Sequence, residues 1–318
     1  TLVDLVGDGI RLKLIAYVAT EGYASAEASF QGAVTYAKDR LQFRAMTGIK
    51  NPNGPADPII VHPDVRRMLL TQKAIAEGGR ALCTDLFFSV DKVEKSDDSD
   101  VISQENNKLA LLTPIAKGFL TELGVECTSL GIQVYGGHGF IKEWGMEQLL
   151  RDTKINCIYE GTTGIQALDL LSRKIIGSEF KLVNEYLSEM VSDITLIAER
   201  DDLMQMASTL IEQINQIRDI NQSINSNVKK NPDEIGAASV DYLMMMGYVV
   251  LGFYWLSMAN KAYQILDKGT DESEFYHAKV ITAQFYIDRI LPRADGHRNA
   301  IRNGANSMMA LKPEHFIF

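Results

Sequence analysis

Cysteine and proline are both scarce in this chain of 318 residues, which contains only three cysteines and eight prolines. The cysteines, Cys83, Cys127 and Cys157, form no C-x-x-C pair, and their odd number argues against a disulfide scaffold or a zinc ribbon. Unpaired thiols suit a reducing compartment, so we expect a cytoplasmic protein. Few prolines, combined with many alanine, leucine, methionine and isoleucine residues, favour helical structure.

An excess of basic charge is also missing, because 41 acidic residues outnumber 32 basic ones and give a net charge of -9. We therefore expect no binding to nucleic acid through the overall electrostatic field, while a local basic patch for a phosphate ligand stays compatible with this charge. The five histidines are scattered, so no metal site is predicted. The first residues, TLVDLVGDGI, lack an initiator methionine and the basic segment of a secretory signal. We expect the sequence to be part of a longer one.

One uncharged stretch of 19 residues, from Tyr242 to Asn260, comes close to the roughly 20 apolar residues of a membrane span. It contains Ser257, Asn260, aromatic residues and glycines, and its neighbours are strongly amphipathic. We therefore predict a buried core helix and no membrane span, with a membrane or oligomer contact as the alternative.

Helical periodicity dominates the chain, because apolar residues recur at steps of three and four. The only strand-like run, at 58–61, is too short to pair. We predict an all-α protein in which a four-helix bundle over 1–177 is followed by a second helical bundle over 178–318, with Gly177 as the helix stop between them. The helices are expected at 3–46, 64–93, 104–131, 146–151 and 162–176, then as about four more that break at 231–232 and 268–270. A basic run is predicted to be solvated surface: Arg289, Arg293, Arg298 and Arg302.

Two loops interrupt the helical texture. The sequence QVYGGHGF at 133–140 has three glycines in four residues, which is typical either of a turn or of a backbone that a ligand approaches closely. The sequence KINCIYEGTTG at 154–164 places Glu160 before a helix start that Thr162 and Thr163 can cap. Glu160 is either a carboxylate favoured by the helix dipole or a general base flanked by free amides.

Taken together and in order, these loops resemble the C-terminal signature of the acyl-CoA dehydrogenase family. The matching segments are QVYGGHGF at 133–140, KE at 142–143, LRDTKI at 150–155 and IYEGT at 158–162. Upstream, YAKDRLQF at 36–43 is similar to the helix-end pattern Y-A-x-x-R-x-Q-F-G of the same family. The segment 56–82 is similar to a subgroup of larger members with an extra helical region. The resemblance is strong over 1–177 and covers 178–318 only as that extension.

The resemblance implies a flavoenzyme that binds FAD and an acyl-CoA thioester. Glu160 matches the glutamate that removes the α-proton while a hydride leaves the β-carbon for the flavin. Tyr159 and Gly161 would line the thioester site. Hydrogen bonds to the developing enolate oxygen and desolvation of the carboxylate would both assist such a base.

The resemblance to the family also implies contacts with FAD. Arg40 would meet the pyrophosphate of FAD in a neighbouring subunit, since a guanidinium binds phosphates in a bidentate manner. A homodimer or larger homo-oligomer is therefore expected. Electron-transferring flavoprotein is the expected electron acceptor. The remaining FAD contacts implied are Gln42, Phe43, Gln133, Gly137 and Thr162.

Some positions depart from the family pattern. Arg44 replaces the glycine after Gln-Phe, and Gly164 replaces a frequent glutamine. The arginine that the family places early in the first helix would fall near Ile15, and only Arg11 lies close to that position. The family's N-terminal helical domain and β-barrel cannot be fitted, so we expect a C-terminal fragment of an enzyme of roughly 600 residues, inactive on its own. The alternatives are an acyl-CoA oxidase and a non-catalytic helical dimerisation module.

Overall fold

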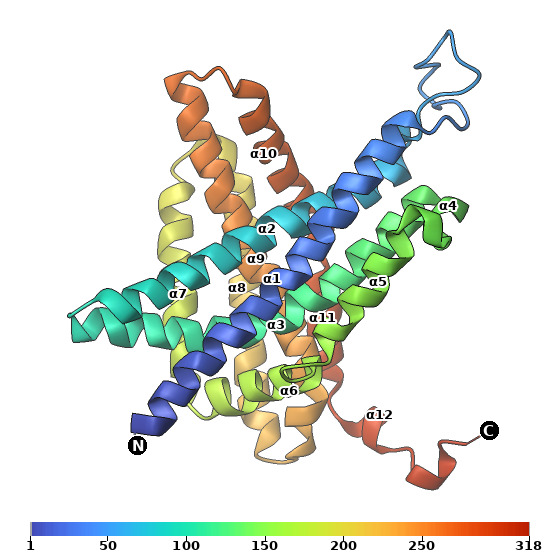
Figure 1. Ribbon diagram of the computed structural model, residues 1–318. Helices are drawn as coiled ribbons and strands as arrows, with labels where there is room; N and C mark the ends of the chain where they lie inside the picture. Colours follow the sequence, from blue (N-terminus) through green and yellow to red (C-terminus); the bar gives the residue numbers. More distant parts are fainter. Residues whose placement is uncertain (1, 318) are drawn as a thin grey trace.

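The computed structural model describes residues 2–317, with side chains from Leu14 onward, and is almost entirely helical (Figure 1). Within these residues there is no strand, and the only bridge joins Leu41 to Pro58. The all-α prediction is therefore confirmed. The elements of the first half are α1 (Leu2–Asp39), η1 (Ile59–Val61), α2 (Pro63–Lys95), α3 (Ser99–Tyr135), α4 (Gly137–Phe140), η2 (Lys142–Trp144), α5 (Met146–Lys154), η3 (Ile155–Cys157), α6 (Thr163–Leu168) and the π-helical η4 (Asp169–Ile176). Those of the second half are α7 (Lys181–Ile197), α8 (Asp201–Val228), α9 (Asp233–Lys268), α10 (Ser273–Phe285), the π-helical η5 (Tyr286–Ile290), α11 (Arg293–Asn303), α12 (Asn306–Met309) and η6 (Pro313–His315).

Helix α1 ends at Asp39, so the prediction of helix up to residue 46 was wrong. The amide of Ile59 donates to the Arg40 carbonyl at 2.8 Å, and the amide of Gln42 donates to the Asp57 carbonyl at 2.9 Å. These hydrogen bonds to a later part of the chain replace the helical ones. Helix α3 begins earlier than predicted, at Ser99, because the Asp98 side chain caps it.

Helices α1, α2 and α3 lie side by side and form the first layer (Figure 1). A Cβ atom added to Gly22 of α1 would lie 2.5 Å from the carbonyl oxygen of Leu120 on α3. One added to Gly124 of α3 would lie 2.7 Å from the carbonyl oxygen of Gly22. The backbones of α1 and α3 therefore touch, and only glycine fits at these positions.

Helix α9 is the central helix of the second half and packs against helices of both halves. It is long and apolar enough to span a membrane, but 67% of its most apolar window is buried inside the protein. Its Trp255 is fully buried, and the indole Nε1 donates to the Ala74 carbonyl of α2 at 3.0 Å. The prediction of a core helix at 242–260 is supported, and the two helix sets share one hydrophobic core.

The junction between the two sets differs from the prediction in detail. The helix ends before Gly177 as expected, but Gly177 keeps a right-handed φ of -63°. The left-handed turn falls instead on Glu179 and Phe180, with φ of 52° and 64°.

The arginines predicted to be solvated are partly internal. Arg293 of α11 forms an ion pair with Glu126 of α3 at 2.9 Å, which ties the two halves together. Arg298 pairs with Asp295 at 2.9 Å. Only Arg289 and Arg302 are fully on the surface, and the prediction was wrong for the other two.

Asp57 organises the loop between α1 and η1. Its carboxylate is buried and accepts hydrogen bonds from the amides of Ala45, Lys50 and Asn51 at 2.7–2.9 Å, and from Arg44 at 3.3 Å. Burial favours the protonated acid, but these donors outweigh it and lower the pKa of Asp57 to about 2.

The loop around Asp57 is therefore expected to open only in strong acid, at a lower pH than an aspartate with an ordinary pKa would allow. Because the folded pKa of Asp57 is depressed, its stabilising effect is complete above about pH 4 and is lost as the pH falls through about 2. The amide chemical shifts of Ala45, Lys50 and Asn51, followed by NMR, should change together with a midpoint near pH 2. In Asp57→Asn these amides should already be perturbed at neutral pH. A wild-type midpoint near pH 4 would contradict the proposed role of the hydrogen bonds.

Candidate functional site

The loop that joins η3 to α6 carries Glu160 in an unusual backbone conformation. Glu160 has a φ of 53° and Gly161 a φ of 92°, so two successive residues are left-handed. For a residue with a side chain this costs about 1–2 kcal/mol. Thr162 then caps α6, because its hydroxyl accepts from the amide of Ile165 at 3.3 Å. Strain of this kind persists only where the surroundings impose it.

Two buried side chains hold the carbonyl groups of this left-handed pair. The Lys117 ammonium, on α3, donates to the Gly161 carbonyl at 2.6 Å. The Gln166 amide donates to the Glu160 carbonyl at 3.0 Å. Lys117 is fully buried, and Gln166 is 5% exposed. These two hydrogen bonds thus hold the backbone of Glu160 and Gly161 in place.

Two further contacts hold the loop at its edges. The Tyr159 hydroxyl donates to the Glu21 carboxylate of α1 at 2.7 Å. The Thr163 hydroxyl donates to the Glu122 carboxylate of α3 at 2.6 Å. Burial and the hydrogen bond to Glu21 raise the pKa of Tyr159 to about 12, so its phenol stays protonated at neutral pH.

The carboxylate of Glu160 is exposed and makes no hydrogen bond or ion pair with the residues that the structure describes. Within the same residues, the amides of Glu160 and Gly161 also donate no hydrogen bond. The loop therefore presents a free carboxylate next to free N–H groups. Such a pair can take a proton from a carbon acid and stabilise the negative oxygen that results.

Five of the predicted cofactor residues meet elsewhere, in one cavity of about 650 Å³ between the ends of α1 and α3. They are Arg40, Gln42, Phe43, Gln133 and Gly137. Phe43 has a left-handed φ of 58° and is 75% exposed. At least 90 positions of sequence separate the first three residues from the last two, and the fold brings them together.

An aromatic cluster, three of whose four residues line this cavity, was not predicted. The rings of Tyr36 and Tyr135 stack at 4.2 Å, and those of His138 and Trp144 stack at 4.7 Å. The Tyr36 hydroxyl and His138 Nδ1 are 2.9 Å apart and hydrogen-bonded. Tyr135, His138 and Trp144, which lie in or next to the glycine-rich loop, were the signal available in the sequence.

The cavity suits a dinucleotide by the chemistry of its lining. Arg40 offers a cation for a pyrophosphate, Gln42 and Gln133 offer amide groups, and the aromatic rings offer flat apolar faces. A Cβ atom added to Gly136 or Gly137 would meet nothing within 4 Å, so the backbone is open to an approaching ligand there. These residues therefore fit FAD.

Thr162 lies with Glu160 and not in this cavity. The two groups of predicted residues lie apart, because the Glu160 loop lies beside the middle of α3, near α6 in Figure 1, and the cavity lies at the C-terminal ends of α1 and α3, near α4. Lys117, which bonds to the Glu160 loop, and Gln133, which lines the cavity, are separated by 16 positions on α3, or about 24 Å of helix. The chain thus has two separate candidate surfaces.

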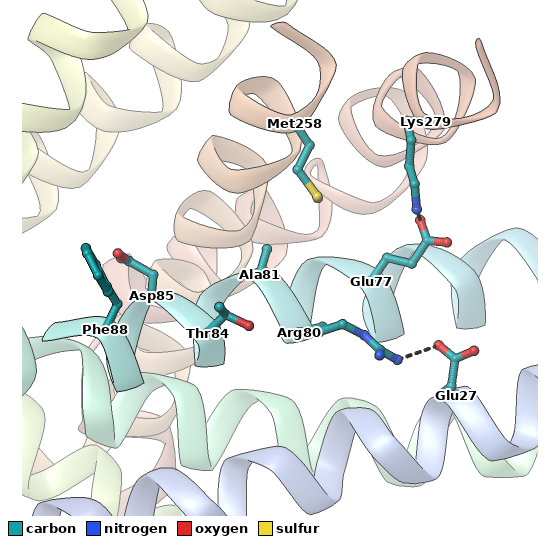
Figure 2. A pocket seen from close by; sticks show the side chains of 9 residues that line it. All are labelled: Glu27, Glu77, Arg80, Ala81, Thr84, Asp85, Phe88, Met258 and Lys279. Carbon is teal, nitrogen blue, oxygen red and sulfur yellow. Dashed lines mark hydrogen bonds and ion pairs between the residues drawn. The ribbon is translucent and has the colours of Figure 1, made fainter. Parts of the chain in front are cut away.

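A further cavity of about 700 Å³ lies between α1, α2, α9 and α10 (Figure 2). None of the predicted site residues lines it. Figure 2 shows Arg80 against Glu27, 3.2 Å apart, and Lys279 against Glu77, 2.9 Å apart. The charges of these four side chains therefore pair with one another.

Family models match both halves of the chain. The model described as "Acyl-CoA dehydrogenase, C-terminal domain" matches residues 16–175, and the one described as "Acetyl-CoA dehydrogenase C-terminal like" matches 187–312. A 3-methylmercaptopropionyl-CoA dehydrogenase from Ruegeria pomeroyi is 35% identical over 92% of this chain and 49% of its own length.

Two solved structures share the fold. ACDH-11 from Caenorhabditis elegans in complex with C11-CoA superimposes with a TM-score of 0.71 at 17% identity, over 92% of this chain and 46% of that one. An acyl-CoA dehydrogenase from Bacillus anthracis complexed with FAD gives 0.68 at 16% identity, over 94% and 50%. The chain thus spans about half the length of the proteins that it matches.

Proposed function

The chain belongs to the acyl-CoA dehydrogenase family, and from this premise we propose that it supplies the catalytic base for FAD-dependent α,β-dehydrogenation of an acyl-CoA thioester. The observation that carries the proposal is Glu160, a free carboxylate next to free amides on a left-handed loop. Buried side chains hold the backbone of that loop in place.

In the proposed reaction, a Glu160 carboxylate oxygen accepts the α-proton of the thioester. The Glu160 amide donates to the thioester oxygen as negative charge develops there, which makes the α-carbon more acidic. Tyr159 and Gly161 line the thioester site, and the protonated Tyr159 keeps the loop bound to α1 through Glu21. Bound FAD would supply the acceptor for the hydride that leaves the β-carbon.

The exposure of Glu160 has to be removed in the working enzyme, since a carboxylate gains basicity when water is excluded. We propose that substrate, FAD and polypeptide beyond these 318 residues cover it. The support is that the matched relatives are about twice as long as this chain.

The second surface is proposed to hold FAD of a neighbouring subunit. Arg40 would bind the pyrophosphate, and Gln42, Phe43, Gln133 and Gly137 would lie along the same molecule. Thr162, in the Glu160 loop, would contact the FAD that serves the chain's own Glu160. The distance of about 24 Å along α3 from Lys117, beside the Glu160 loop, to Gln133, in the cavity, supports this division. The division in turn requires a dimer or larger homo-oligomer.

The test is to add a panel of acyl-CoA thioesters without oxygen to the protein as the cell makes it and to record the flavin absorbance. We expect bleaching by at least one acyl-CoA, followed by reoxidation by electron-transferring flavoprotein and little peroxide in air. Peroxide formed with no added acceptor would identify an oxidase. If no acyl-CoA binds or bleaches the flavin, the chain is a non-catalytic helical module.

A further inference from the structure

Lys117 is a fully buried lysine in the middle of α3. Burial of an ammonium group costs free energy, and a methionine would fill similar space without that cost. The hydrogen bond from Lys117 is directed at the Gly161 carbonyl, at 2.6 Å, and not at a carboxylate. Stability alone therefore does not account for a lysine at this position.

The hydrogen bond from Lys117 is made to the part of the candidate site with the most strained backbone. Glu160 and Gly161 are both left-handed, and a Cβ atom added to Gly161 would lie 2.9 Å from Gln166 Nε2. A conformation of this kind needs external support to persist. Lys117 and Gln166 provide it, because each donates to the carbonyl of one of the two residues.

We propose that Lys117 is a positioning residue for Glu160, which it holds in the left-handed conformation through the carbonyl of Gly161. Since it rests on the proposed role of Glu160 as the base, the inference deepens that role. Through Lys117, helix α3 would fix the position of the Glu160 carboxylate relative to the Glu160 amide. A displaced base would still let acyl-CoA bind but would meet the α-carbon poorly.

The charged surroundings of Lys117 agree with this role. Burial lowers the pKa of Lys117, and the nearby carboxylates of Glu122 and Glu160 oppose that effect. The Lys117 ammonium therefore interacts favourably with the Glu160 carboxylate as well as with the Gly161 carbonyl. Lys154, at the start of the loop segment, lies 3.9 Å from Glu122 and is 54% exposed.

The test compares Lys117→Met with the wild type by two measurements. We expect kcat to fall on the order of 10–100-fold while the Kd for the best acyl-CoA of the panel changes less than about twofold. Independently of activity, the amides of Ile165 and Gln166, which donate hydrogen bonds to Thr162 at the end of this loop, should exchange with solvent deuterium on the order of tenfold faster. Lys154→Met is the matched control, and it should change neither quantity.

A second variant keeps the test valid if Lys117→Met does not fold. Gln166→Leu removes the other support and should show the same pattern of lower kcat, unchanged Kd and faster exchange. Wild-type kcat and exchange in Lys117→Met would overturn the positioning role even if Glu160→Gln is inactive. By contrast, normal turnover by Glu160→Gln would overturn the proposed function itself.

Discussion

Replacement of Glu160 by glutamine is expected to slow turnover of acyl-CoA by about 10²–10⁴-fold, because a general base contributes about that much to the rate. Glutamine keeps the size of the side chain and the left-handed backbone but cannot accept the α-proton. FAD content and the Kd for acyl-CoA should therefore stay close to those of the wild type. Anaerobic single-turnover reduction of the flavin measures the effect directly.

The chain offers a matched control for this substitution. Glu179 is also an exposed glutamate with a left-handed φ, at 52°, but it lies in the turn between the two helix sets. Glu179→Gln removes the same charge from the same backbone conformation and should leave turnover unchanged. Comparable losses in both variants would point to a general effect of charge and remove Glu160 from the mechanism.

Truncation of Trp255 to alanine is expected to lower the free energy of unfolding by about 3–5 kcal/mol, the range observed for large aromatic residues in protein cores. The side chain is fully buried, and its loss also leaves the Ala74 carbonyl without the indole donor. Because Trp255 of α9 bonds to α2, the loss should affect both helix sets at once. Chemical denaturation followed by circular dichroism and by tryptophan fluorescence measures it.

The control for Trp255→Ala lies on the same helix. Val240 of α9 is 42% exposed, so Val240→Ala should change stability by less than about 0.5 kcal/mol. The wild type should unfold in one transition, since the two helix sets share one core. Two separate transitions, of which Trp255→Ala alters only the one that belongs to the second helix set, would contradict a shared core.

The sequence predicted the helices well where apolar periodicity is strong. The prediction failed at 40–46, where hydrogen bonds from residues 57–59 compete with helical ones. Such bonds depend on which distant segment lies alongside, and no local pattern records that. Asp98 fell outside the predicted helices, although an aspartate followed by a helical stretch is a recognised cap.

The candidate site was predicted in part, because its residues follow an ordered motif. Glu160 and Thr162 stand in one continuous segment, and the structure confirms the cap at Thr162. Lys117 was missed, because a lysine in a helix is usually a surface residue and its burial depends on where the 155–164 loop packs. The pairing of Arg293 with Glu126 was missed for the same reason, since 167 positions separate the two residues.

The backbone contact between Gly22 and Gly124 has a consequence for changes in chain length. An insertion of one residue in α3 beyond Gly124 would rotate everything that follows by about 100° and advance it by about 1.5 Å, while the glycine contact holds the preceding part still. Gln133 would then leave the cavity that it shares with Arg40. The segment 125–132 should therefore accept no insertion or deletion in natural variants.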